Sequence, residues 1–386
     1  MTVESATYID TLDPTLPLAG DPKSEGDNHL RLIKQVLKNT FPNVNGAIQA
    51  TDENLDALRG LSGRLNLVIN PHGSIQQQTT TPQTGAANYF ADQWLGAIAA
   101  AGGAAEYGVL ATGTVSDWDP CHMYFKTTTA KVSLAAGDGT VFLQPMEGAY
   151  TRRLRWGTAN AKKALLRFRA SASQSGVASF ALRNGGNNRS YVQAFNVTTT
   201  PTDYSFIIDG DTSGTWAVDN TQGVNLSFCH SAGSSGQTAT LGAWQAGNFF
   251  AANTQSNMLD TVNRQLNITD VMFARSDVLL PFEPIDFQLE LLRCMRYFET
   301  GKIYVLGYQA DPGGAGTVGE RIPYIAIKRA TPSITFANRS QAGVVTAAGT
   351  GLAFGDPGNG SFTAVYTTSG VGGYNAAETF TANSRF

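Results

Sequence analysis

Charged residues are scarce in this chain of 386 residues, where Asp, Glu, Lys and Arg together make up only 15%. Helix-rich enzymes normally carry more Glu and Lys on their exposed faces. Gly, Ser, Thr, Asn and Gln are abundant instead, which suits β-structure with polar exposed faces and many turns. The formal net charge is −3 and no block of basic residues occurs, so we expect no nucleic-acid partner.

Long apolar runs are also missing. No stretch reaches the ~18 consecutive apolar residues of a membrane-spanning helix, so we expect no membrane insertion. The first residues contain no basic start followed by an apolar stretch, so we expect no secretory signal and synthesis in a cytoplasm.

The residue patterns of metal sites and of common catalytic centres do not occur. The histidines lie far apart and none has a second ligand at helical spacing, so we predict no metal and no cofactor. The cysteines are too scattered for a disulfide framework and are predicted to be buried small hydrophobes. The signatures G-x-S-x-G and H-E-x-x-H and the phosphate-binding loop are absent, so no catalytic residue is assigned and we predict a protein that is not an enzyme. The residues concerned are Cys121, Cys229, Cys294, His29, His72, His122 and His230.

Aspartates on neighbouring strands and turns keep one enzymatic alternative open. Two carboxylates about 5–9 Å apart can cleave a glycosidic bond. The sequence cannot place any two of these aspartates across a cleft, and turns are a usual location of aspartate. The four are Asp203, Asp209, Asp211 and Asp219.

The length predicts two or three domains, and residues 66–285 read as an all-β body. Side chains of residues 164–170 are expected to point alternately to the two faces of a strand, with Leu166 and Phe168 toward the core and Leu165 and Arg167 toward solvent. Several short strands separated by turns favour a β-sandwich. The other strand-like runs are residues 66–70, 191–197, 204–208, 224–228 and 266–271.

A short amphipathic helix is predicted at residues 286–301, between the body and a Gly-rich last module. Leu291, Met295 and Phe298 fall on one face of it, and Gly301 is placed to end it. Residues 302–386 then predict a small β domain of their own. Its expected strands cover residues 303–308, 324–327, 334–337 and 362–366.

Residues 1–65 combine an extended apolar peptide with two short helices. The prolines Pro14 and Pro17 favour an extended chain, and such a peptide without its own core should bury itself on something else. A disordered tail is the alternative. The helices are expected from a capping pattern at Ser24 and near residues 51–60, with Leu30, Ile33 and Leu37 on one face of the first. Helices this short are marginal alone, so a symmetric oligomer or the next domain should cover them.

Two stretches resemble the tail fibre proteins of phages and prophages. Residues 8–44, from Tyr8-Ile9-Asp10 through Leu12–Pro17 to Asn43-Val44, are similar to the N-terminal virion-attachment segment of that family. Residues 282–299 resemble the joint where a sandwich domain ends in a "PFE" turn and an "EL-CQRYFE" helix, with Met295 where Gln is usual. Asn66–Asn70 and Tyr89–Trp94 are similar to stretches of that sandwich domain.

The resemblance implies a mainly β fold with a jelly-roll β-sandwich like a carbohydrate-binding module and a small distal β domain. It implies location in the virion, usually as a homotrimer, with phage tail or baseplate proteins and a host surface glycan or receptor as partners. The residues expected to anchor the chain to the virion are Tyr8, Ile9, Leu12, Pro14, Leu16, Pro17 and Leu18.

Four aromatic residues next to predicted loops are receptor-binding candidates, because flat rings stack on the apolar faces of sugars. They are Trp118, Trp216, Tyr366 and Tyr374, and ordinary packing is the alternative for each; Trp94, Trp156 and Trp244 are assigned to the core. The sequence thus predicts a non-enzymatic tail fibre that binds a host receptor. A glycan-cleaving tail protein and a structural adaptor for another fibre are the alternatives.

Overall fold

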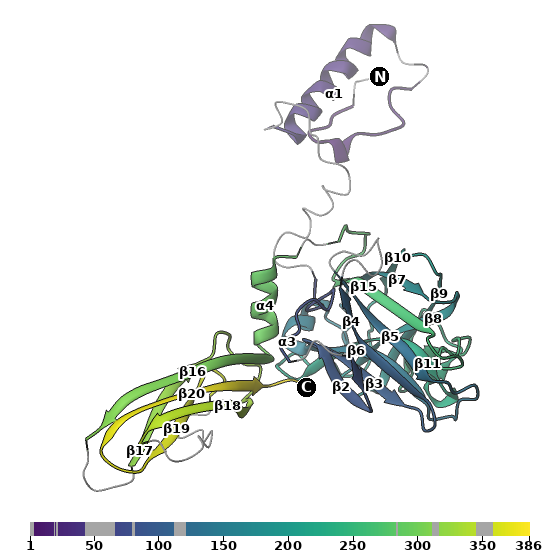
Figure 1. The fold of residues 1–386 in the computed structure, drawn as a ribbon. Helices are drawn as coiled ribbons and strands as arrows, with labels where there is room; N and C mark the ends of the chain where they lie inside the picture. The colour runs from purple at the N-terminus through teal and green to yellow at the C-terminus, as the bar shows by residue number, and fades with distance from the viewer. Residues whose placement is uncertain are drawn as a thin grey trace. The chain divides into compact units, whose positions relative to one another are not determined.

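In the computed structural model, two compact units divide the chain, Met1–Leu55 and Asp56–Phe386 (Figure 1). The structure describes residues 4–18, 20, 22–42, 66–78, 82–111, 121–282, 285–310, 316–344 and 358–386. The protein is mainly β, as predicted, with antiparallel sheets and few helices. The second short helix expected near residues 51–60 lies outside the described residues.

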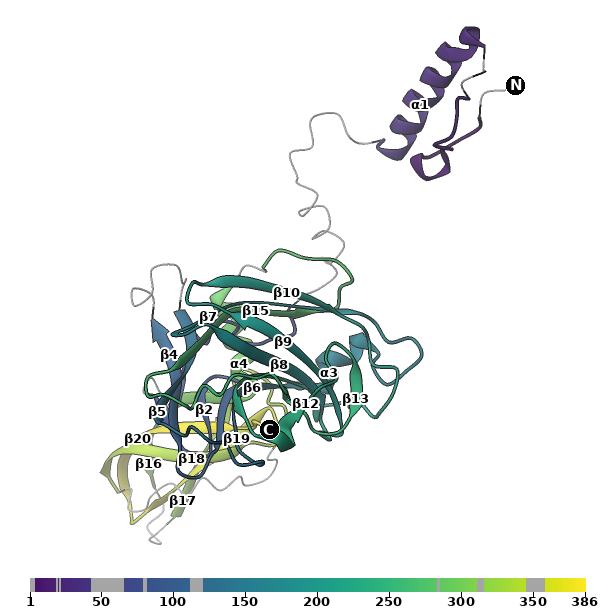
Figure 2. The same cartoon turned by 90° about the vertical axis from the view of Figure 1, so that its right-hand side faces the viewer.

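The first unit is a peptide folded back along its own helix, as Figure 2 shows. It contains η1 (Ile9–Thr11), η2 (Lys23–Glu25) and α1 (Gly26–Thr40). The Ile9 N–H donates to Thr40 Oγ1 at 3.1 Å, and Asn39 Nδ2 donates to the Thr7 carbonyl at 3.2 Å. The expected side-chain cap at Ser24 does not form, because η2 precedes α1 and Glu25 takes the N-cap position without a side-chain bond.

The helix α1 keeps an apolar face exposed even with the peptide beside it. Val36 is buried, but the residues predicted to face inward are 41–60% exposed. The first unit therefore buries little apolar surface of its own. The exposed large apolar side chains of this unit are Tyr8, Ile9, Leu18, Leu30, Ile33, Leu37 and Phe41.

The second unit begins with a β-sandwich of two antiparallel sheets. One has the order β1-β4-β5-β15-β7-β10 and the other β13-β9-β8-β11-β6-β3-β2. The first sheet comprises β1 (Gln83–Thr84), β4 (Ala104–Ala111), β5 (Cys121–Thr129), β7 (Ala164–Ala172), β10 (Thr202–Ile208) and β15 (Gln265–Ala274). The second comprises β2 (Ala87–Ala91), β3 (Trp94–Ala99), β6 (Gly139–Glu147), β8 (Gly176–Asn184), β9 (Arg189–Val197), β11 (Gln222–Ala232) and β13 (Trp244–Ala246). The short strands β12 (Gln237–Thr238) and β14 (Ala251–Ala252) pair in parallel.

Aromatic side chains from both sheets fill the space between them. The Phe168 ring on β7 lies 4.9 Å from that of Phe228 on β11, which lies 5.7 Å from Phe142 on β6. Leu166 and Phe168 face this core as the alternation predicted. Leu165 was expected to face outward but is fully buried, because Met272 and Leu280 cover it in a smaller cluster outside the sheet.

Residues 66–70 are buried but do not form the predicted strand. Side-chain bonds replace a strand ladder: Asn66 donates to the Val271 carbonyl at 2.9 Å and accepts from the Phe273 N–H at 3.0 Å. Asn70 adopts a left-handed φ of 54°, which ends any extended run.

The linking helix is shorter than predicted. The helix α4 spans Phe287–Met295, and Asp286 caps it by accepting from the N–H groups of Gln288 and Leu289. Gly301 does not end the helix, because it lies inside strand β16 (Phe298–Gln309) opposite Phe380. A Cβ at this position would lie 2.4 Å from the Phe380 ring, so the glycine makes room for that ring.

The last module consists of a three-stranded sheet, β16-β20-β18, and a two-stranded sheet, β17-β19. Its other strands are β17 (Gly316–Pro323), β18 (Ser333–Gly343), β19 (Ser361–Thr368) and β20 (Gly372–Asn383). Ile303, Phe362 and Phe380 form its core. Residues 324–327 are not the predicted strand, because after Pro323, the last residue of β17, the Ile325 N–H donates to the Glu299 side chain at 3.0 Å and not to a strand.

Charged groups tie the last module to the sandwich. Arg296 pairs with Glu147 through bonds of 2.9 and 2.6 Å, and Tyr297 also donates to Glu147 at 2.9 Å. Arg385 reaches Asp92 at 3.4 Å. No helix in the described ranges is both long enough and apolar enough to cross a membrane.

Candidate functional site

A cavity of about 360 Å³ lies between two loops of the sandwich. One loop carries α3 (Gly148–Thr151) and η3 (Arg152–Leu154) and leads into β7, and the other connects β10 to β11. The lining residues are Thr151, Arg152, Arg155, Trp156, Thr158, Asn160, Trp216, Ala217, Val218 and Val224.

Backbone hydrogen bonds join the two loops. The Gly148 N–H donates to the Thr221 carbonyl at 2.8 Å, and the Ala149 N–H donates to the Asp219 carbonyl at 2.6 Å. The Gly157 N–H donates to the Asp211 carbonyl at 2.7 Å. These bonds hold the two loops together, so the protein itself sets the positions of the residues that line the cavity.

A buried ion pair fixes the second loop to the sheet. Arg189 on β9 binds Asp211 with two parallel bonds of 2.8 and 2.6 Å, and the Asp211 side chain is only 2% exposed. The same carboxylate accepts from the Ser213 N–H at 3.0 Å. This two-bond arrangement is among the strongest that a side chain can make, and it sets the path of the chain just before Trp216.

Two tryptophans, Trp156 and Trp216, line the cavity, and a third, Trp244, contacts both of them without lining it. The Trp156 ring lies 4.9 Å from both Trp216 and Trp244, and those two lie 5.2 Å apart, all in tilted or edge-to-face contact. Each indole N–H donates to a backbone carbonyl: Trp156 to Lys162, Trp216 to Ser213 and Trp244 to Asp209. The protein satisfies these polar atoms itself, so the rings offer apolar faces of fixed orientation.

Gly157 lets the two loops approach each other. Its φ is +81°, and a Cβ there would lie 2.7 Å from the Gly214 carbonyl and 2.8 Å from the Trp216 ring. Any larger residue would push Trp216 out of position.

The rim of the cavity is polar. Arg152, Arg155, Thr158 and Asn160 are exposed and belong to the first loop. Aromatic faces inside and hydrogen-bonding groups at the rim suit a ligand that has an apolar face and polar edges, as a sugar ring has.

The four aspartates considered from the sequence each have a partner. Asp203 binds Arg169 at 2.7 Å, Asp209 binds Lys163 at 2.9 Å, and Asp211 binds Arg189. Asp219 accepts from the Thr221 N–H and hydroxyl at 2.9 and 2.6 Å. None of the four is among the residues that line the cavity.

No family model matches the sequence, and no curated protein matches it. Solved structures do resemble the chain at low identity. A family 61 carbohydrate-binding module in complex with β-1,4-galactotriose is 10% identical, with 55% of this chain and 100% of that chain covered and a TM-score of 0.29. The CBM22-1 xylan-binding domain of Paenibacillus barcinonensis Xyn10C is 8% identical, with 56% and 100% covered and a TM-score of 0.27.

A phage protein is also among these structures. The enzymatically active domain of tailspike protein 4 from bacteriophage CBA120 is 11% identical, with 54% of this chain and 21% of that chain covered and a TM-score of 0.29. Similarities this distant transfer no ligand and no activity to the present chain.

Of the four predicted receptor-binding residues, the three that the structure describes do not all lie together, and they differ in how exposed they are. Trp216 is half-buried and lines the cavity. Trp118 lies outside the described residues. Tyr366 is 1% exposed in the core of the last module, so its ring has no face open to a ligand. Tyr374 is half-buried against that core, and its hydroxyl lies over Gly307.

The predicted anchoring residues all belong to the first unit. Tyr8, Ile9, Pro14, Pro17 and Leu18 are exposed. Leu12 and Leu16 are half-buried. Their exposure leaves apolar surface for a partner to cover.

Of the lining residues, only Trp216 was predicted as a site residue, and the misses that matter most are Trp156, Arg152 and Arg155. Trp156 was assigned to the core and is indeed 6% exposed, yet it also lines the cavity. Arg152 and Arg155 were not singled out, although the run Arg152-Arg153-Leu154-Arg155-Trp156 combines positive charge with an aromatic ring. In a chain with so few charges, this run was the available signal.

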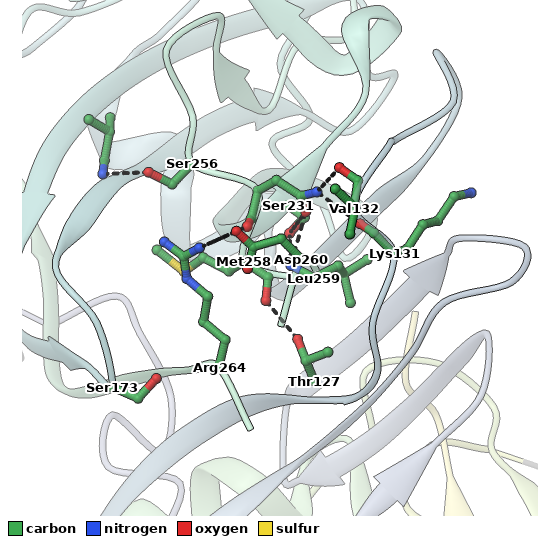
Figure 3. A network of polar contacts seen from close by, with 12 residues as sticks. Thr127, Lys131, Val132, Ser173, Ser231, Ser256, Met258, Leu259, Asp260 and Arg264 are labelled. Carbon is green, nitrogen blue, oxygen red and sulfur yellow. Dashed lines mark hydrogen bonds and ion pairs between the residues drawn. The ribbon is translucent and has the colours of Figure 1, made fainter. Parts of the chain in front are cut away.

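A second polar cluster, shown in Figure 3, holds the segment before β15 in place. Asn257 donates to the carbonyls of Lys131 and Val132 at 2.9 and 3.0 Å, and Arg264 pairs with Asp260 at 2.6 Å. Its members bind one another, so the cluster has a structural role. In the part of the chain that the structure describes, no group of three or more His, Cys, Asp or Glu is placed to hold a metal ion.

Proposed function

We propose that the chain is a phage tail fibre protein that attaches to the virion through its first unit and binds a host surface glycan through the sandwich. The observation that carries the glycan-binding part is the cavity between the two loops, with Trp156 and Trp216 inside and polar side chains at the rim. The virion-attachment part rests on the resemblance of residues 8–44 and on the exposed apolar side chains there.

Trp216→Ala is expected to weaken binding to host cells or purified host polysaccharide by about thirtyfold or more, because buried aromatic anchors contribute about 2 kcal/mol or more. The matched control is Trp244→Ala, which removes a neighbouring ring of the same cluster that does not line the cavity. Affinity measured by biolayer interferometry should fall for the first variant only. Equal affinities for W216A and the wild type would overturn the proposed site.

Deletion of residues 1–22 is expected to abolish incorporation into virions while host-cell binding stays intact. The paired substitution Tyr8→Ser and Leu18→Ser removes two exposed apolar side chains and should act in the same direction. Val262→Ser is the control, because Val262 is a similarly exposed apolar side chain outside residues 8–44. Particle composition by immunoblotting measures the effect, and normal incorporation of the deletion variant would refute the attachment role.

We propose a homotrimer, as the resemblance to tail fibre proteins implies, and two exposed apolar rows of the chain supply surfaces suited to contacts between subunits. Besides the row on α1, Tyr304, Leu306 and Tyr308 alternate along β16 and are 65–77% exposed. Leu306→Asp should therefore shift the sedimentation of the intact protein toward single chains. Val132 on the sandwich is as exposed as Leu306, at 77%, so Val132→Asp is the matched control. A wild-type protein that sediments as one chain would contradict this assembly.

We infer that the protein binds the glycan without cleaving it, since none of the described lining residues is acidic. Incubation with host polysaccharide should leave the polymer length unchanged, and shorter products would show glycan cleavage instead. A structural adaptor would not touch the host. Host-cell binding by a fragment that begins at Asn66 separates the fibre from the adaptor.

A further inference from the structure

We propose that the cavity selects an acidic saccharide, one whose sugar ring carries a carboxylate or a phosphate group. This inference rests on the proposed glycan binding and names the class of glycan. Its basis is the pair Arg152 and Arg155, which line the same cavity as Trp216.

The two guanidinium groups have no acidic partner among the residues that the structure describes. Of the acids on the neighbouring loop, Asp211 pairs with Arg189 and Asp209 with Lys163, and Asp219 accepts hydrogen bonds from Thr221. Both arginines are exposed, and neither takes part in an ion pair within the described ranges. Their charge is therefore available to a ligand that enters the cavity.

The local charge contrasts with the rest of the chain. The whole sequence has a net charge of −3, yet residues 152–162 contain Arg152, Arg153, Arg155 and Lys162 and no acidic residue. Positive charge concentrated beside a cavity attracts anions and raises their local concentration. A neutral sugar would gain nothing from this positive charge.

The backbone at Arg155 adds to the argument. Arg155 has a left-handed φ of 55°, a conformation that glycine adopts at less cost. Its N–H donates to the Arg152 carbonyl at 3.0 Å, so the tight turn brings the two arginines onto one rim. An unfavourable backbone conformation that carries a charged side chain into a cavity is typical of a binding site.

The chemistry of arginine fits this ligand. The guanidinium group presents several N–H donors in a plane, which match the oxygens of a carboxylate or a phosphate. The Trp216 face would hold the sugar ring while the arginines bind its acidic group. The proposed ligand is defined by its acidic group, which a uronic acid supplies as a carboxylate and a phosphorylated sugar as a phosphate.

The test is an array of bacterial capsular and O-antigen polysaccharides, each printed beside a carboxyl-reduced copy and a dephosphorylated copy. The intact protein should bind acidic members, and removal of the acidic group should weaken binding at least about tenfold. The preference should disappear when the salt concentration rises from about 0.05 to 0.5 M, because salt screens exposed charges. Loss on carboxyl reduction identifies a uronic acid, and loss on dephosphorylation identifies a phosphorylated sugar.

Substitutions test whether the two arginines cause the preference for acidic saccharides. The double substitution Arg152→Gln and Arg155→Gln should remove it, whereas Arg153→Gln should retain it, because Arg153 lies between them but does not line the cavity. Arg155→Gly relieves the left-handed backbone, so it should keep the melting temperature while it loses the preference. A purely structural role of Arg155 would lower the melting temperature and reduce neutral and acidic binding alike.

The possible failures can be told apart. Equal binding to native polysaccharides and their neutralised copies would overturn the acidic preference and leave the proposed glycan binding standing. An array with no bound member would overturn both. Retention of the preference by the R152Q/R155Q protein would remove the two arginines from the assignment.

Discussion

Replacing Lys328 with alanine is expected to lower the free energy of unfolding by about 3–5 kcal/mol. The Lys328 side chain is fully buried, and its Nζ binds the Glu299 carboxylate and the Met295 carbonyl. Glu299 is 2% exposed and also accepts from the Ile325 N–H at 3.0 Å. Burial lowers the pKa of Lys328, an effect that the bond with Glu299 opposes. Without the lysine, the Glu299 charge would remain buried and uncompensated.

Urea unfolding followed by circular dichroism measures this effect. Lys163→Ala is the control, because that lysine forms an exposed pair with Asp209 and should contribute at most about 1 kcal/mol. The double substitution Lys328→Met and Glu299→Leu should recover much of the loss, since it removes both charges. A K328A protein as stable as the wild type would show that the buried pair is not formed.

Acidification is expected to destabilise the sandwich between pH 6.5 and pH 4, because two buried histidines resist protonation. Burial lowers the pKa of His122 from 6.5 to about 4 and that of His230 to about 3. His230 contacts Thr140 at 3.2 Å and stacks on Phe125 at 4.9 Å. Burial dominates its pKa; a hydrogen bond with the Arg264 backbone raises the pKa, the Arg264 charge lowers it and the Asp260 charge raises it.

The sign follows from which state binds the protons. Below pH 6.5 the unfolded chain protonates both histidines, but the folded chain does not until its lower pKa values are reached. At pH 5 each histidine therefore lowers the free energy of unfolding by about 2 kcal/mol, and the two together by about 4 kcal/mol. Above about pH 7.5 both states of the chain hold these two histidines almost fully neutral, so the groups add almost no pH dependence to the free energy of unfolding.

Urea unfolding at pH 7.5 and pH 5 compares the wild type with the His122→Asn and His230→Asn double variant. The variant should lose about 4 kcal/mol less than the wild type over this interval, whatever its stability at pH 7.5. Equal losses in the two proteins would show that both histidines take up protons in the folded state.

The sequence predicted the parts of the fold that repeat a local pattern. Residues 164–170 alternate because one side of β7 faces the core, and that pattern identified Leu166 and Phe168 correctly. Leu165 was predicted wrongly because residues distant in sequence, Met272 and Leu280, cover the other side. Gly301 was misread because a glycine after a helix is a usual stop, whereas here its partner Phe380 lies on a strand far along the chain.

The site was only partly predictable for the same reason. Trp216 follows a turn in the sequence, which marked it as a candidate. Its partners Trp156, Arg152 and Arg155 come from a loop more than one strand earlier, and backbone bonds between the loops bring them together. A single sequence contains no local sign of such bonds.

The most direct test of glycan binding at the cavity is a crystal structure of the intact protein with an oligosaccharide from a host polysaccharide that it binds. We expect a sugar ring against Trp216, with its acidic group within hydrogen-bond distance of Arg152 or Arg155. An oligosaccharide bound to another surface, with Trp216 and both arginines making no contact to it, would contradict the proposed site.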